Sequence, residues 1–323
     1  MHRIAVLTSG GDAPGMNACI RAVVRTALYN KIEVFGVERG YQGLIAGNIR
    51  QLDSHSVSNI IQRGGTILKT ARCAEFHTAE GRKKAHASLV AHDIDGLVVI
   101  GGNGTYTGAK YLSEEYEIKI VGLPGTIDND LFGTDFTIGY DTAINTALGA
   151  IDKIRDTADS HDRIFFVEVM GKDSGFIAMD VGISGGAEAV LIPETETDIV
   201  NLTTTLEQGW GRQKSSQLII VAEGDQFGGV EGIVEQVKSR IPALDCRILV
   251  LGHIQRGGSP TARDRVLASR LGAAAVEGLK DGRNKTAIGV VNNHLQYVTF
   301  DDAISKRKPI TKSLIALAEI LST

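Results

Sequence analysis

Short apolar segments recur along the whole chain and restrict the folds that it can adopt. They are apolar throughout instead of alternating with polar residues, which is typical of strands buried on both faces of a parallel sheet. Segments with helical spacing lie between many of them. The pattern predicts an α/β fold, doubly wound, with largely parallel sheets. The apolar runs cover residues 4–7, 34–37, 97–100, 120–123, 164–169, 189–192, 218–222, 248–251 and 288–291.

The length and composition indicate two ordinary folded domains. The chain has 323 residues, and at roughly 150 residues per domain each half is large enough to bury its own core. Hydrophobic residues make up 43% and charged residues 22%, which excludes a disordered chain. No repeat and no Pro/Ser-rich linker is visible, so we expect the domains to share a tight interface and the chain to cross between them more than once.

Charge and cysteine usage exclude several classes of partner. The formal net charge is −4, which lacks the basic excess that nucleic-acid binding requires. The apolar run near the start is shorter than a signal-peptide core or a membrane span, so we expect no export and no membrane anchor. Three widely spaced cysteines form no C-x-x-C pair. A reducing cytoplasm is therefore the expected location.

Glycine is the compositional outlier, with 38 residues, or about 12% against a usual value of about 7%. The loops at the carboxyl ends of parallel strands form the ligand crevice of open α/β sheets, and glycine lets the backbone approach a phosphate closely. The alternative is that these glycines only make tight turns. Pairs of glycines follow three of the apolar runs, namely Gly10 and Gly11, Gly101 and Gly102, and Gly257 and Gly258.

Residues 101–108 leave one apolar run and open a helix, so their backbone amides are placed to bind phosphate at a helix N-terminus. Gly102, Gly104 and Gly108 give G-x-G-x-x-x-G, which differs from the dinucleotide fingerprint. The phosphate-loop motif of many nucleotide hydrolases and the protein-kinase signatures are also missing from the sequence. Phosphoryl transfer in this chain therefore requires another scaffold.

Residues 124–130 follow a further apolar run and contain two carboxylates. In an extended stretch Asp128 and Asp130 point the same way, so one can accept a hydroxyl proton while the other holds Mg²⁺. An acidic surface turn is the alternative. Residues 252–260 offer Arg256 for phosphate and His253 beside it. Arg163, Arg247 and Glu223 are further candidates for a sugar-phosphate pocket, although each taken singly also fits a solvated surface charge.

Five segments together resemble the bacterial 6-phosphofructokinases over nearly the whole chain. They read LTSGGDAPGMN at 7–17, GGNGTY at 101–106, PGTIDND at 124–130, IRDTADSHDR at 154–163 and GHIQRGGSPTARDR at 252–265. The resemblance implies two Rossmann-like domains, with ATP bound by residues 1–138 plus 256–305 and fructose 6-phosphate bound by residues 139–255 plus 306–323. It further implies phosphorylation of the sugar 1-hydroxyl, using ATP and Mg²⁺, at the committed step of glycolysis.

The resemblance also assigns roles to individual residues. Asp128 would be the general base, Thr126 and Lys172 would lie beside the transferred phosphoryl group, and Asp130 and Asn103 would lie near Mg²⁺. The nucleotide would be bound by Gly11, Tyr41, Arg72, Cys73, Gly102, Asn103, Gly104, Thr105 and Gly108. The sugar phosphate would be bound by Met170, Gly171, Lys172, Glu223, His253 and Arg256, and by Arg163 and Arg247 from a neighbouring subunit of a homotetramer.

Two glycines select the phosphoryl donor in this resemblance. Pyrophosphate-dependent relatives carry Asp in place of Gly104 and Lys in place of Gly125, so ATP is expected here. Asn103 stands where the family usually has aspartate, so a negative charge that Mg²⁺ favours is lost. Lys172 stands where arginine is usual, so a bidentate fork is lost. A catalytically weakened subunit that binds sugar phosphate or an effector is therefore the alternative, and a pyrophosphate-dependent enzyme is a lesser one.

An effector site for ADP or phosphoenolpyruvate is implied as well, and it is altered. Arg21 and Arg25 form an i, i+4 pair on one face of a helix that begins near Asn17. Ser54, Asn59 and Ser216 stand where arginine, aspartate and histidine are usual, so a working site and an ordinary charged helix both stay open. The matching residues are Arg21, Arg25, Arg155, Glu188, Arg212 and Lys214.

Overall fold

The computed structural model describes residues 1–158, 163–211 and 217–322, and its contacts divide the chain into two compact units. The first unit comprises Met1–Ile127, Leu131–Thr142 and Arg256–Lys308. The second comprises Asp128–Asp130, Ala143–Gln255 and Pro309–Thr323. Within the described residues, no helix is long and apolar enough to cross a membrane.

The first unit is built on a seven-stranded sheet in the order β11-β10-β5-β4-β1-β2-β3. The central strands are parallel, whereas β2 with β3 and β10 with β11 form antiparallel pairs at the edges. The strands are β1 (Arg3–Thr8), β2 (Glu33–Val37), β3 (Ile49–Leu52), β4 (Gly96–Gly101), β5 (Lys119–Pro124), β10 (Thr286–Val291) and β11 (His294–Thr299).

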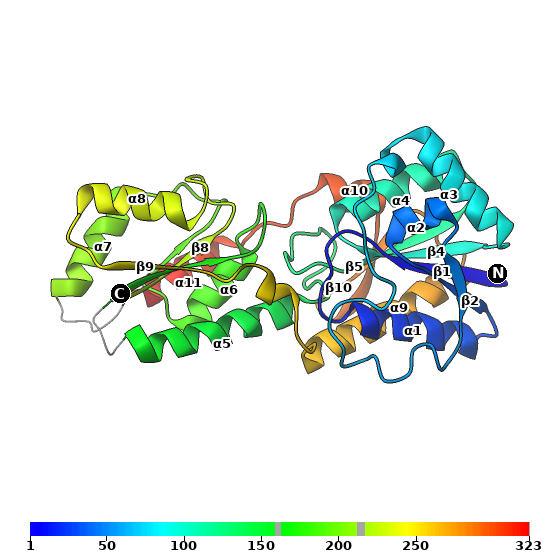
Figure 1. Cartoon of the computed structure of the whole chain (residues 1–323), viewed down its shortest axis with the longest axis horizontal. Helices are drawn as coiled ribbons and strands as arrows, with labels where there is room; N and C mark the ends of the chain where they lie inside the picture. Colours follow the sequence, from blue (N-terminus) through cyan, green and yellow to red (C-terminus); the bar gives the residue numbers. More distant parts are fainter. Residues whose placement is uncertain (159–162, 212–216, 323) are drawn as a thin grey trace. The chain divides into compact units, whose positions relative to one another are not determined.

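Helices cover both faces of this sheet (Figure 1). On one face lie α1 (Met16–Tyr29) and α9 (Ala262–Lys280). On the other lie α2 (Gly40–Ala46), α3 (Ala79–Ala91), α4 (Asn103–Glu115) and α10 (Phe300–Ser305). The short 3₁₀ turn η1 (Glu75–His77) directly precedes α3. The apolar core between the sheet and this second group contains Leu7, Leu44, Leu89, Tyr106 and Phe300. The doubly wound prediction is confirmed for this unit.

The second unit carries a four-stranded parallel sheet in the order β7-β8-β6-β9. Its strands are β6 (Ile164–Val169), β7 (Ala189–Leu191), β8 (Gln217–Ala222) and β9 (Cys246–Val250). One core joins this sheet to α7 (Ile199–Gly211) and α8 (Val230–Arg240). The remaining helices are α5 (Tyr140–Ala158), which starts in the first unit, α6 (Phe176–Gly185), the short η2 (Gly252–Arg256) and α11 (Lys312–Leu321).

The expectation that every apolar run is buried on both faces is wrong for β9. Ile248 is 44% exposed and Val250 is 51% exposed. The reason is that, among the strands the structure describes, β9 pairs with β6 alone and forms the edge of its sheet. By contrast, all six residues of the central strand β8 are buried.

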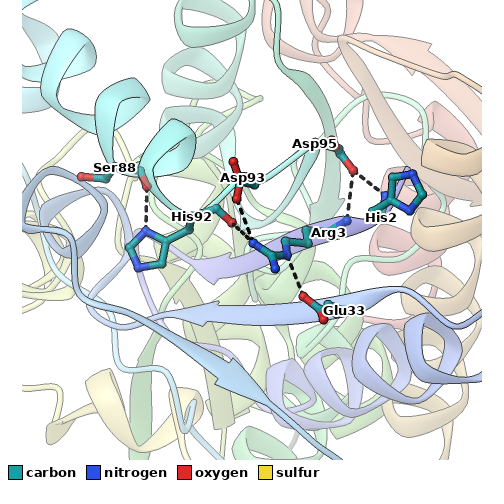
Figure 2. Close-up of polar contacts among 7 residues, drawn as sticks. All are labelled: His2, Arg3, Glu33, Ser88, His92, Asp93 and Asp95. Carbon is teal, nitrogen blue, oxygen red and sulfur yellow. Dashed lines mark hydrogen bonds and ion pairs between the residues drawn. The ribbon is translucent and has the colours of Figure 1, made fainter.

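The amino edge of the larger sheet is held by charged contacts around Arg3 (Figure 2). The Arg3 guanidinium donates to Glu33 at 2.6 Å and to Asp93 at 3.0 Å, and the backbone amides of His2 and Arg3 donate to Asp95. These contacts join the start of β1 to β2 and to the turn before β4. They lie at the opposite end of the strands from the glycine-rich loops.

A buried carboxylate joins the starts of α5 and α9. Asp264 is 1% exposed and accepts hydrogen bonds from the amides of Gly139 and Thr142 at 2.9 and 2.8 Å and from the Thr142 hydroxyl at 2.5 Å. Thr261 caps α9 by accepting from the Asp264 amide. Burial raises the pKa of Asp264 against these hydrogen bonds. The segment that leads from β5 into α5 is therefore fixed to α9 at its end.

Candidate active site

The carboxyl ends of β1 and β4 bring two glycine-rich loops together in the first unit. The Ser9 amide donates to the carbonyl of Ile100 at 3.0 Å, and the Thr105 hydroxyl donates to the carbonyl of Ser9 at 3.1 Å. Residues 10–11 and 101–102 therefore lie at one edge of the sheet. This is the edge at which parallel α/β sheets bind ligands.

The helix predicted to follow the second loop is confirmed as α4, with Gly102 at its N-cap. A Cβ placed on Gly104 would meet no atom within 4 Å, so the first turn of α4 faces open space at this position. Gly101, in contrast, needs its hydrogen side chain because a Cβ would lie 2.5 Å from the Ser9 carbonyl. The arrangement is an unobstructed helix N-terminus, which favours an anion.

Tyr41 supports α4 from within the core. Its ring is buried and stacks on Phe76 with centroids 3.9 Å apart, and its hydroxyl donates to the carbonyl of Thr105 at 2.6 Å. Burial raises the pKa of Tyr41, so the hydroxyl stays a donor. A Cβ on Gly108 would lie 2.8 Å from the Tyr41 ring. Tyr41 and Gly108 thus hold the first turns of the helix in place.

Arg72 and Cys73 follow a segment that is tied to the first loop. The Thr70 hydroxyl donates to the carbonyl of Gly10 at 2.7 Å. Arg72 is exposed, whereas Cys73 is half-buried and packs against the core beneath α2 and α4. Arg72 therefore has the freedom to reach a ligand, and Cys73 contributes packing.

Arg256 lies across the first loop. A Cβ on Gly11 would be 1.7 Å from Arg256 Nη2, so the guanidinium occupies the space that a side chain would take. Its Nε donates to the Asp12 carbonyl at 3.3 Å and its Nη2 lies 3.4 Å from the Asp12 carboxylate. The structure places this predicted sugar-phosphate residue in the first unit, paired with a carboxylate.

The end of β5 is packed against the same edge. The Thr126 carbonyl accepts from the Thr137 hydroxyl at 2.6 Å. A Cβ on Gly125 would lie 2.8 Å from Ile100 Cγ2 and 3.0 Å from Met16 Cε. Gly125 is therefore buried between core side chains, and a longer residue would displace Ile100.

The prediction that residues 128–130 are extended is wrong. The chain bends at 127 and 128, and Asn129 is buried with φ 54°, in the left-handed region. Asn and Asp tolerate this conformation better than other residues with side chains. A two-residue period along the strand therefore does not set the directions of Asp128 and Asp130.

Residues Asp128–Asp130 belong to the second unit, although the chain on both sides belongs to the first. The Ser174 hydroxyl donates to the Asp128 carbonyl at 3.3 Å, and the Ser174 amide donates to the Gly171 carbonyl at 3.0 Å. The predicted base is thus joined through its backbone to the loop of Met170, Gly171 and Lys172, called here the 170–172 loop. Sequence reasoning missed Ser174.

The 170–172 loop has an unusual backbone and is held by side chains. Gly171 has φ 151° and Lys172 has φ 55°. One oxygen of Glu223 accepts from the amides of both residues, at 3.2 and 2.7 Å. The buried Gln255, which sequence reasoning missed, accepts from the Met170 amide at 2.9 Å. Glu223 was expected at the sugar phosphate, and the structure shows it bound to the loop.

The remaining side chains of this group are exposed. Lys172 Nζ lies 3.6 Å from the Asp173 carboxylate, with most of the lysine side chain in solvent. His253 is exposed in η2, between the end of β9 and Gln255. Within the second unit, the carboxyl ends of β6, β8 and β9 therefore gather the 170–172 loop, Glu223 and His253 at one edge of the sheet.

Comparison with known proteins agrees with this arrangement. A family model for phosphofructokinase matches residues 3–279. The chain belongs to the phosphofructokinase family. It is 58% identical over 322 residues to the ATP-dependent 6-phosphofructokinase of Cytophaga hutchinsonii, covering 100% of this chain and 98% of that protein. It is 54% identical to ATP-dependent 6-phosphofructokinase 1 of Thermus thermophilus, covering both in full.

A solved phosphofructokinase has the same fold. The structure from Saccharomyces cerevisiae superposes with a TM-score of 0.88 at 34% identity, and the match covers 100% of this chain and 47% of the yeast chain. A pyrophosphate-dependent phosphofructokinase from Marinobacter aquaeolei gives a TM-score of 0.85 at 22% identity, with 99% and 91% covered. The latter supports the phosphofructokinase fold alone.

Arg163 and Arg247 lie away from the other predicted sugar-phosphate residues of the second unit. Both guanidinium groups contact one oxygen of Asp245, at 3.4 and 3.1 Å. They flank the amino ends of β6 and β9, whereas the 170–172 loop follows the carboxyl end of β6. Arg163 and Met170 stand on either side of the six residues of β6, so seven steps of about 3.3 Å put them about 23 Å apart. The structure does not bring these arginines together with Glu223 and His253.

The predicted effector residues have separate surroundings. On α1, Arg25 is exposed and donates to the Ser54 carbonyl at 3.4 Å, and Arg21 is half-buried. In the second unit, Arg155 donates to the carbonyls of Gly185 and Gly186 at the end of α6. The Glu188 carboxylate accepts from the Leu218 amide at 2.6 Å. Arg212, Lys214 and Ser216 lie outside the described residues, and Asn59 is exposed with φ 53°.

Proposed function

We propose that this chain transfers the γ-phosphoryl group of ATP to the 1-hydroxyl of D-fructose 6-phosphate, the committed step of glycolysis. The observation that carries the proposal is 58% identity over the full chain with a protein of that activity. The strand-end loops of the two units supply the amides and cations that two phosphorylated substrates need. Positioning and electrostatics provide most of the acceleration in such transfers.

The first unit is the proposed nucleotide domain. The amides of Gly11, Gly102, Gly104 and Thr105 line the phosphates, and Arg72 supplies a mobile cation. Support comes from the open first turn of α4, where Gly104 leaves room for a nucleotide. Tyr41, Cys73 and Gly108 act by holding that turn and the neighbouring segment in place.

Mg²⁺ is the proposed metal, and the side-chain oxygens of Asn103 and Asp130 would hold it together with the nucleotide phosphates. Mg²⁺ uses one or two protein carboxylates with substrate phosphates instead of an all-protein cage. This fits the chain, since the described residues contain no group of three or more His, Cys, Asp or Glu side chains that could hold a metal. When bound, the metal would neutralise charge on the phosphates. The amide of Asn103 makes this donor set weaker than a pair of carboxylates.

Asp128 is the proposed general base. Its carboxylate would accept the proton of the sugar 1-hydroxyl while that oxygen bonds to the γ-phosphorus and the bond to the departing ADP breaks. Thr126 and Lys172 would donate to the transferred group. Support comes from the Ser174 hydrogen bond, which joins the Asp128 backbone to the turn that also contains Lys172.

The proposed sugar-phosphate site combines residues of two subunits in a homotetramer. Met170, Gly171, Glu223, His253 and Arg256 would come from one chain and Arg163 and Arg247 from its neighbour. The separation of the arginines from the 170–172 loop along β6 supports a shared site. ADP or phosphoenolpyruvate is the proposed effector, bound by Arg21, Arg25, Arg155, Glu188, Arg212 and Lys214.

The test is steady-state turnover of fructose 6-phosphate with ATP and Mg²⁺, beside the same assay with pyrophosphate. We expect turnover with ATP and none with pyrophosphate, because Gly104 leaves the first turn of α4 open and the chain lacks the Asp and Lys that pyrophosphate-dependent relatives carry at positions 104 and 125. Asp128→Ala and Arg163→Ala variants should each be inactive or weak, and mixed hybrids of the two should regain activity. Turnover with pyrophosphate but not with ATP would refute ATP as the phosphoryl donor. Hybrids without activity would refute a site shared between subunits.

A second candidate function is a weakened subunit that binds sugar phosphate or an effector and modulates an active paralogue. Asn103 in the first turn of α4 favours it, because the usual carboxylate is lost there. Co-purification with a paralogue that carries Asp at this position would support it. Ordinary kinase turnover by the purified chain alone would exclude it.

A further inference from the structure

Gln255 is an uncharged residue buried in the second unit beside the 170–172 loop. Its side chain is 0% exposed. Its Oε1 accepts from the Met170 amide at 2.9 Å, which links η2 to the first residue of the loop. The neighbouring His253 is exposed, so Gln255 is the residue of η2 that contacts the loop from inside the unit.

The other end of this side chain is unsatisfied. Gln255 Nε2 is buried and has no hydrogen-bond partner among the described residues. Burying an amide donor without an acceptor is unfavourable, and an apolar side chain of similar size would avoid the penalty. Glutamine at this position therefore carries a cost at Nε2, set against the hydrogen bond that its Oε1 accepts from the Met170 amide. Buried polar atoms that lack a hydrogen-bond partner are a feature of functional sites.

The loop that Gln255 contacts depends on its supports. Gly171 and Lys172 both have positive φ, and a residue with a side chain in the left-handed region is strained unless its surroundings fix it. Glu223 binds the amides of Gly171 and Lys172, and the Met170 amide is left to Gln255. A Cβ on Gly224 would lie 2.1 Å from the Lys172 carbonyl, so the loop is also packed closely from that side. The three consecutive amides are thus fixed by two side chains.

We propose that Gln255 is a positioning residue for sugar-phosphate binding. It fixes the Met170 amide and so holds the 170–172 loop in the conformation that receives the substrate. The inference rests on the proposed function, which assigns Met170, Gly171 and Lys172 to the sugar phosphate. Removal of the Gln255 acceptor lets the loop leave this conformation, so sugar-phosphate affinity falls while ATP affinity is retained.

The experiment compares three variants of the full chain. Gln255→Leu keeps the volume and removes both polar atoms, and Gln255→Glu keeps an acceptor for the Met170 amide. Gln217→Leu is the matched control, because Gln217 is a second glutamine of the described residues of this unit that is buried with one unpartnered atom. It begins β8, at the far end of the sheet, and donates to the Leu206 carbonyl at 3.1 Å. KM for each substrate, kcat, the melting temperature and calorimetric binding of fructose 6-phosphate are measured.

We expect Gln255→Leu to raise KM and Kd for fructose 6-phosphate about tenfold, because the variant loses one buried hydrogen bond. The KM for ATP should stay within about twofold of that of the parent. Gln255→Glu should recover most of the affinity, and Gln217→Leu should leave both KM values unchanged. Equal rises in both KM values, an unchanged sugar-phosphate KM in Gln255→Leu, or the same rise in Gln217→Leu would overturn the inference.

The parent protein separates this inference from the proposed function. If the parent neither binds nor phosphorylates fructose 6-phosphate, the proposed function is wrong and the inference falls with it. If the parent does both and Gln255→Leu binds the sugar phosphate as tightly as the parent, only the role of Gln255 is wrong. A lower melting temperature without a change in Kd would likewise show a merely structural role.

Discussion

Replacing Gly104 with aspartate is expected to weaken ATP binding without harming the fold. A Cβ at this position meets no atom within 4 Å, so the new side chain fits without displacing anything. The residue lies in the first turn of α4, where a negative charge stabilises a helix by about 0.3–1 kcal/mol. Gly104→Asp should therefore unfold at the same urea concentration as the parent or at a higher one.

The same carboxylate would face the nucleotide phosphates that we propose for this turn. Two like charges about 4 Å apart repel by about 1 kcal/mol in bulk water and about 4 kcal/mol near a protein surface. Since Gly104 is exposed, we take the lower part of this range, about 1–2 kcal/mol. Each factor of ten corresponds to about 1.4 kcal/mol, so the KM for ATP should rise about 5- to 30-fold.

The assay measures KM for ATP and for fructose 6-phosphate, together with urea unfolding. Gly104→Ala separates charge from volume and should raise the KM for ATP much less than Gly104→Asp. Gly149→Asp is the matched control, because Gly149 lies in α5 and a Cβ there also meets no atom within 4 Å. Added salt should reduce the effect of Gly104→Asp, because it screens exposed charges.

Two results would refute the reasoning. An unchanged KM for ATP in Gly104→Asp would mean that the nucleotide phosphates do not approach the first turn of α4. An equal rise in Gly104→Ala would mean that space and not charge is decisive at this position.

Four further substitutions have defined outcomes. Asn103→Asp and Lys172→Arg should each raise kcat/KM about 5- to 150-fold, because they add a carboxylate for Mg²⁺ and a bidentate fork; steady-state kinetics without any gain would refute the idea that these residues weaken the enzyme. Asp264→Ala should lower the free energy of unfolding by about 2–5 kcal/mol, because two amides at the start of α5 lose their acceptor; urea denaturation measures the loss, and a change near zero would contradict it. Burial opposes ionisation of Asp95, but hydrogen bonds from the amides of His2 and Arg3 outweigh it and lower the pKa of this carboxyl. The ionised Asp95 therefore stabilises the fold above the unfolded pKa of 3.8, and this stabilisation is lost as the pH falls through the folded pKa. Asp95→Asn should flatten this acid dependence in thermal melts, and an unaltered pH profile would contradict the assignment.

The strands predicted from the sequence are those whose own residues are apolar on both faces. Each of the nine apolar runs overlaps a strand, because a central strand of a parallel sheet needs apolar side chains on both faces. Ile49–Leu52 and His294–Thr299 were missed since they are antiparallel edge strands with polar residues. The same edge effect explains β9, whose apolar residues stay exposed. Position in a sheet is set by tertiary pairing, which a single run of residues does not encode.

The site shows a similar division. Glycines after strands predicted where two loops of the first unit lie, at the carboxyl ends of β1 and β4; that these loops bind phosphate stays a prediction. Ser174 and Gln255 were missed, since their roles depend on one hydrogen bond to a residue far along the chain. The bend at Asn129 was missed because the period of a strand was extended past its end.

Three groups that the resemblance assigns to phosphate already bind carboxylates of the same chain. Arg256 pairs with Asp12, Arg163 and Arg247 share Asp245, and two amides of the 170–172 loop share Glu223. A phosphate at any of them would replace or join an existing partner, so its net gain is smaller than that of a new ion pair in an empty site. The carboxylates also hold the donors in fixed directions before a ligand arrives. These sites therefore favour selectivity for a correctly shaped phosphate ester over affinity for any anion.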